Sequence, residues 1–144
     1  MPQSHGVQLH ADNSRSRPLT LSLVLVSLTI AAGISIRFAR LGLAPFIVKY
    51  GGSMLWALMI YWFVSTLLPL RRFMSTALLS GTLCTAVEFF KLYHSPALNA
   101  FRLTLPGMLI LGRTFSVWDL AAYWVAISVG TILDKVIRHA AQIK

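Results

Sequence analysis

Four long apolar runs constrain this chain more than any other feature. Residues 19–36 and residues 51–70 contain no charged side chain, while residues 73–90 and residues 114–133 contain one acid each. About 20 mainly apolar residues are enough for a helix to cross a bilayer, and lipid offers no partner for free backbone groups. The sequence therefore predicts an all-α integral membrane protein, a bundle of four transmembrane helices.

The composition favours the same fold class. Hydrophobic residues make up 56% of the 144 residues and charged residues only 12%, whereas a soluble domain carries about 25% charged residues. A chain of this length holds one domain at most. We expect a transmembrane domain over residues 19–137, between a disordered tail at residues 1–18 and a C-terminal tail at residues 138–144.

Two segments need separate interpretations. The run LTLPGMLILG, residues 103–112, is too short to span and contains Pro106-Gly107, so we expect a re-entrant or interfacial segment between the third and fourth helices. The first apolar run follows basic residues and ends near Ala31-Ala32-Gly33. It therefore has a second interpretation as a cleaved signal peptide, although it is long for one and continues into charged residues.

The charge balance is basic, with 13 Lys and Arg against 4 Asp and Glu. These bases fall between the apolar runs and in the tails, and no nucleic-acid motif accompanies them. We interpret them as anchors for anionic headgroups, so membrane lipids are the expected partners, together with a homo-oligomer or another membrane protein, and nucleic acid is not. The membrane face that holds both termini carries slightly more bases than the opposite face. This excess favours cytoplasmic termini.

Small and polar residues recur every four positions on two of the predicted helices. Such stripes let helix backbones approach closely, which indicates a compact bundle. In the fourth run the stripe is Ala122, Ala126 and Gly130, and in the third it is Thr76, Ser80, Cys84 and Glu88.

Glu88 and Asp119 are acids inside apolar runs, where a charge is costly. Glu88 predicts either a ligand or proton site with a cationic partner, or a structural ion pair with Lys91 three residues later. Asp119 follows Ser116 with the spacing of a capping box, so it has a plain interpretation as a helix cap.

The topology brings these acids to one face of the membrane, because the third helix ends where the fourth begins. The connection between them and the first loop add several bases at that face. This cluster could hold a zwitterionic or phosphate-bearing headgroup, or it could be a salt-bridge network that ties loops to helix ends. The candidate ligand-binding residues are Glu88, Arg102, Asp119, Tyr123, Lys49 and Arg37.

Motifs for catalysis, metals and cofactors are missing from the sequence. The four histidines are scattered without a metal-ligand spacing, Cys84 is the only cysteine, and no nucleophile elbow, P-loop or dinucleotide fingerprint occurs. Two carboxylates could serve as acid and base, but nothing else supports an enzyme, and we expect no metal and no cofactor. A small transporter ranks lower, because the second run offers only Ser53, Ser65 and Thr66 for a polar path.

The stretch VEFFKLYHSPALNAFRLTLPGMLILGRTFSVWDLAAYW carries a resemblance. It resembles the small bacterial membrane proteins of domain-of-unknown-function family 2809 and, more distantly, the VanZ-like family. The resemblance extends over roughly residues 20–135 and is strongest from Glu88 to Tyr123. It implies a four-helix protein of the bacterial inner membrane without an established activity. The VanZ-like proteins are associated with glycopeptide-antibiotic resistance, which by analogy suggests a role in the cell envelope.

Overall fold

The computed structural model describes residues 18–38, 42–68 and 72–142. Within these ranges the chain forms six helices and no strand, and four of the helices are long and apolar enough to cross a membrane. This confirms the predicted all-α fold with four transmembrane helices. The helices are α1 (Leu19–Phe38), α2 (Pro45–Leu67), α3 (Phe73–Phe90), α4 (Pro96–Leu103), α5 (Leu105–Ile110) and α6 (Val117–Gln142).

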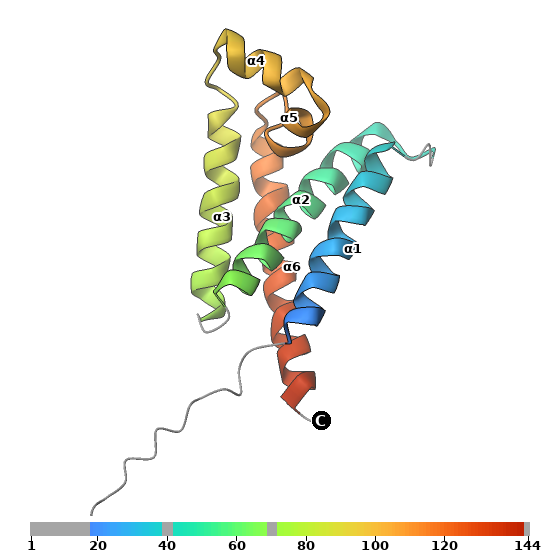
Figure 1. The fold of residues 1–144 in the computed structure, drawn as a ribbon, viewed down its shortest axis with the longest axis vertical. Helices are drawn as coiled ribbons and strands as arrows, with labels where there is room; N and C mark the ends of the chain where they lie inside the picture. The colour runs from blue at the N-terminus through green and yellow to red at the C-terminus, as the bar shows by residue number, and fades with distance from the viewer. Residues whose placement is uncertain (1–17, 39–41, 69–71, 143–144) are drawn as a thin grey trace, which may run out of the picture.

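Helices α2 and α6 form the centre of the bundle. Helix α2 packs against α1, α3 and α6, while α3 also packs against α6 and α1 contacts α2 alone among the helices. The start of α1 and the end of α6 lie at the same end of the molecule, and α4 and α5 lie at the opposite end (Figure 1). The predicted up-and-down order of the helices is therefore what the chain adopts.

Both small-residue stripes are packing faces. On α6, Gly130 and Ala126 are buried, and a Cβ added at Gly130 would lie 2.8 Å from Leu58 and 3.1 Å from Tyr61 on α2. On α3, all four members of the stripe from Thr76 to Glu88 are buried. Close backbone approach is what small residues allow between membrane helices, so the stripes position α3 and α6 for the site described below.

Gly81 on α3 provides a direct test of this packing. A Cβ at this position would overlap the indole ring of Trp124 on α6, with Cζ3 only 2.7 Å away. We expect Gly81→Ala to lower the free energy of unfolding by about 1–3 kcal/mol, since overpacking forces helices apart. The control is Gly33→Ala, whose Cβ would lie 3.8 Å from Leu55 Cβ and should be tolerated. Equal thermal stability of the two variants in detergent would contradict this packing.

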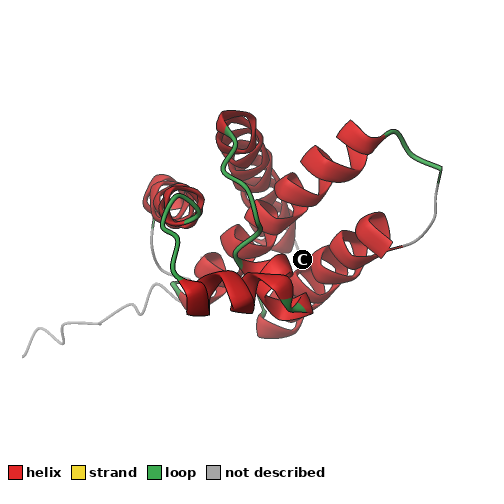
Figure 2. Cartoon of the chain, turned by 90° about the horizontal axis from the view of Figure 1, so that it is seen from above, coloured by secondary structure: helices red, strands yellow, loops and turns green. Residues whose placement is uncertain are grey.

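The connection between α3 and α6 contains two short helices rather than one segment. Ser95 caps α4 by accepting a hydrogen bond from Leu98 N at 3.3 Å, and Thr104 caps α5 through Gly107 N at 3.2 Å. Pro follows each cap at the first or second helical position, where its fixed φ suits a helix start. Seen from above, α4 lies across the end of the bundle (Figure 2). The expected non-spanning segment is confirmed, with α5 inside it.

Two helix boundaries differ from those expected. Helix α2 begins at Pro45, so Lys49 and the glycines after it are helical and not part of a loop, because Pro favours the first helical turn. Helix α6 continues to Gln142, so residues 138–142 are helical and not a tail. Residues 1–17 of the expected N-terminal tail and residues 143–144 lie outside the described ranges.

Candidate functional site

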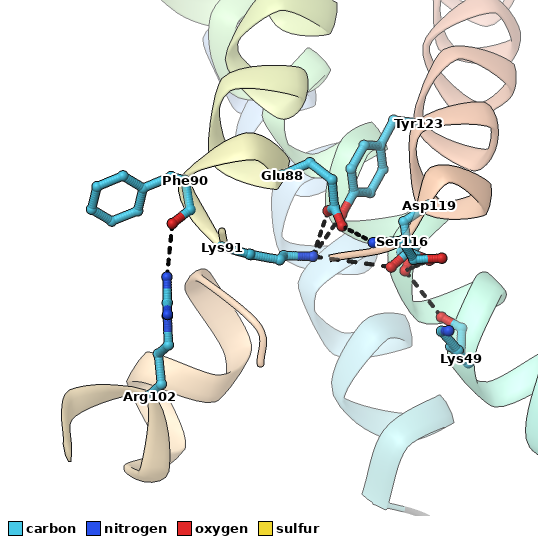
Figure 3. A network of polar contacts seen from close by, with 9 residues as sticks. Lys49, Glu88, Phe90, Lys91, Arg102, Ser116, Asp119 and Tyr123 are labelled. Atoms are coloured by element: carbon cyan, nitrogen blue, oxygen red, sulfur yellow. Dashed lines mark hydrogen bonds and ion pairs between the residues drawn. The ribbon is translucent and has the colours of Figure 1, made fainter. Parts of the chain in front are cut away.

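Glu88 is completely buried at the end of α3 and connects two helices. Its carboxylate forms an ion pair with Lys91, which follows α3 and folds back over its last turn. On the α6 side, Tyr123 donates its hydroxyl hydrogen to Oε2 at 2.7 Å, and the Ser116 amide donates to Oε1 at 2.8 Å. The alternative of a structural ion pair between Glu88 and Lys91 is therefore realised, and the carboxylate has three donors (Figure 3).

Asp119 brings α2 into the same network. Its Oδ1 accepts a hydrogen bond from Ser53 Oγ at 3.2 Å, and its Oδ2 lies 4.0 Å from Lys91 Nζ. Lys91 thus lies between the two acids (Figure 3). Gly112 makes room for it, since a Cβ there would be 3.2 Å from Lys91 Nζ. Three transmembrane helices meet at this polar network, as the topology predicted.

The helix start at Ser116 is capped differently from the expected capping box. In a capping box the acid at the third helical position accepts from the cap residue's own amide, but here that amide donates to Glu88 of α3. Asp119 is free to turn toward Ser53 instead. No sequence signal could show this exchange, because it joins residues of two helices.

Arg102 lies apart from the acids with which it was grouped. Its Nη2 donates to Phe90 O at 2.8 Å and its Nη1 donates to Tyr93 O at 3.0 Å. These carbonyls are at the end of α3 and just after it, where helices leave acceptors without intrahelical partners. Arg102 therefore fastens α4 to the end of α3, and its side chain points toward Phe90 O, with Asp119 on the far side of Lys91 (Figure 3).

A cavity of about 260 Å³ opens beside the polar network. Asp119, Lys91 and Tyr123 line it, and residues 108–114, from α5 and the turn after it, cover another side. Three further bases also line it: Arg37 at the end of α1, Lys49 on α2, and Arg113 just before α6. The structure thus brings four of the six sequence-predicted residues to the cavity wall, and a fifth, Glu88, is bonded to the wall residues Lys91 and Tyr123. Arg113 lines the cavity and Arg102 does not.

The charges of this cavity are not balanced within the described residues. All three acids of the described ranges have other partners: Glu88 pairs with Lys91, Asp119 with Lys91 and Ser53, and Asp134, away from this cavity, with Arg138. No carboxylate in the ranges that the structure covers lies within ion-pair distance of Arg37, Lys49 or Arg113. Cations gathered around one cavity favour an anionic group.

A second polar cluster, at the opposite end of the bundle, was missed by the sequence reasoning. Asp134 is completely buried on α6 and binds Arg138 through Nε at 3.0 Å and Nη2 at 3.1 Å. Ser65 and Tyr61 of α2 donate to the same carboxylate at 2.8 Å and 3.3 Å. The signal was available, because Tyr123, Gly130, Asp134 and Arg138 follow one helical face. The fourth apolar run ends at residue 133, so Asp134 lies just outside the predicted span.

Comparison with protein families matches more than half of the chain. The family described as "Protein of unknown function (DUF2809)" matches residues 42–127, which include Lys49, Glu88, Asp119 and Tyr123 but not Arg37 or Asp134. No solved structure matches the chain. Among the residues described, no group of three metal-binding side chains occurs.

Proposed function

Because this chain belongs to the DUF2809 family of proteins of unknown function, we propose its function from the geometry of the site alone. The protein is a multi-pass membrane protein that binds the phosphate-bearing headgroup of an envelope lipid in the basic cavity beside Asp119. Arg37, Lys49 and Arg113 bind the phosphate, and Asp119 accepts from hydroxyl or amine groups of the headgroup. We place it in the bacterial inner membrane with both termini in the cytoplasm.

One observation supports this function most strongly. Three cations without a carboxylate partner in the described ranges line a single cavity, while every acid of those ranges is already paired or hydrogen-bonded. A structural role alone would need no unpaired cations around an open volume. Charge-assisted contacts of Arg and Lys with phosphate are short and strong, and Arg adds a bidentate geometry.

The structural alternative explains another part of the site. Glu88, Lys91 and Tyr123 bond to one another, and Arg102 donates to the backbone carbonyls of Phe90 and Tyr93. We propose that these four residues hold α3, α4 and α6 together and that the cavity bases bind the ligand. The Glu88 network and the cavity bases can then be tested separately.

The test of the proposal is lipid retention after gentle extraction. We expect the triple variant Arg37→Gln, Lys49→Gln, Arg113→Gln to lose bound anionic phospholipid in native mass spectra, with roughly tenfold weaker retention per removed cation. The matched control is Arg72→Gln with Lys135→Gln, two exposed bases at the other end of the bundle. Retention that falls equally in both variants, or in neither, would contradict binding at the cavity.

A further inference from the structure

A second cavity continues from the basic one toward the middle of the membrane. It has a volume of about 150 Å³ and lies between α1, α2 and α5. Its walls are almost entirely apolar, apart from Thr29 at one end and Arg37 at the other. The other α1 and α2 wall residues include Ile30, Gly33, Ile34, Leu55 and Met59.

The two cavities are neighbours that share a wall. Arg37, Trp56, Leu109 and Ile110 line both of them. The Arg37 side chain is held against α2 at this junction, since a Cβ added at Gly52 would lie 3.0 Å from its Nε. A lipid with its charged head in the basic cavity and its hydrocarbon tail in the apolar cavity would therefore extend past Arg37.

The direction of the apolar cavity fits a lipid chain. From Arg37 to Thr29 it follows α1 for eight residues, about 12 Å at 1.5 Å per residue. Arg37 is in the last turn of α1 and Thr29 is near the middle of that helix. A chain in this groove would thus descend from the headgroup level into the hydrocarbon layer, as a lipid does.

We infer that the apolar cavity between α1, α2 and α5 binds one acyl chain of the phospholipid whose phosphate lies in the basic cavity. This inference rests on the proposed function and specifies its ligand as a membrane-embedded phospholipid, not a water-soluble phosphate ester. Leu109 and Ile110 of helix α5 line both cavities. Helix α5 therefore lies between the acyl chain and the headgroup.

The experiment uses the full chain in phosphatidylcholine nanodiscs that contain phosphatidylglycerol with a diazirine in its acyl chain. After illumination, we expect the adducts to concentrate on the α1 and α2 residues of the groove. Gly33→Leu fills the groove and should reduce these adducts at least tenfold. Ala32→Leu adds the same bulk to the exposed neighbour on α1 and should leave them unchanged.

A second measurement separates the two proposals. An amine-reactive reagent labels the cavity lysines, and glycerol phosphate should protect them equally in the wild type and in Gly33→Leu. In the Arg37→Gln, Arg113→Gln variant, the protection by glycerol phosphate should be at least tenfold weaker. Equal protection of the wild type and that double variant overturns the proposed function. Normal protection with adducts spread evenly over all lipid-facing helices overturns only the acyl-chain inference, as does a stable dimer that covers the groove. If Gly33→Leu fails to fold, the adduct map of the wild type decides alone.

Discussion

Glu88→Ala is expected to lower the free energy of unfolding by about 3–5 kcal/mol, the range observed when one partner of a buried ion pair is removed. The substitution leaves the ammonium of Lys91 buried with Asp119 4.0 Å away as its remaining carboxylate. It also leaves the Tyr123 hydroxyl and the Ser116 amide without their acceptor. Unfolding can be followed with a thiol-reactive dye, because the single cysteine, Cys84, is buried in the core.

The control for Glu88 removes both charges together. Glu88→Leu with Lys91→Met removes both members of the closest pair, so no buried ammonium is left without Glu88, and Asp119 keeps its hydrogen bond from Ser53. Buried pairs replaced by apolar residues are often neutral in stability. The double variant should therefore unfold at a higher temperature than Glu88→Ala, with a coupling energy of up to about 3 kcal/mol between the two sites. If Glu88→Ala melts like the wild type, Glu88 does not join α3 to α6.

Asp134→Ala should have an effect of similar size at the opposite end of the bundle, about 3–5 kcal/mol. The bidentate contact with Arg138 is lost, and the hydroxyls of Ser65 and Tyr61 lose an acceptor. Because Ser65 and Tyr61 belong to α2, the loss weakens the α2–α6 contact. The loss of unfolding free energy can be measured with the same thiol-reactive dye on Cys84.

The neighbouring residue is the matched control for Asp134. Lys135 is exposed and its ammonium lies 5.8 Å from the centre of the Phe73 ring, so Lys135→Ala should change stability by less than about 1 kcal/mol. Lipid retention by folded Asp134→Ala should equal that of the wild type, since Asp134 does not line the basic cavity. Similar melting temperatures of Asp134→Ala and Lys135→Ala would show that the buried Asp134–Arg138 pair contributes little to stability.

Some of the site followed from topology and some did not. The meeting of Glu88 and Asp119 was predictable, because an antiparallel helix pair brings the end of one helix beside the start of the next. The role of Arg102 was not predictable, because its partners are the carbonyls of Phe90 and Tyr93, and a backbone acceptor leaves no mark on sequence. Arg113 lies on the same connection as Arg102, but nothing in its spacing placed it at the cavity instead of Arg102.

The sequence by itself determined the class of this protein and the number of its spans, because the length and polarity of an apolar run are set directly by the bilayer. It also identified the packing faces, since a stripe of small residues lies on one side of a helix whatever packs there. Only the tertiary structure decided which helix each charge would meet. Lys91 lies between two acids while Arg37, Lys49 and Arg113 are left around a cavity, and that division depends on distances between helices that no single run contains.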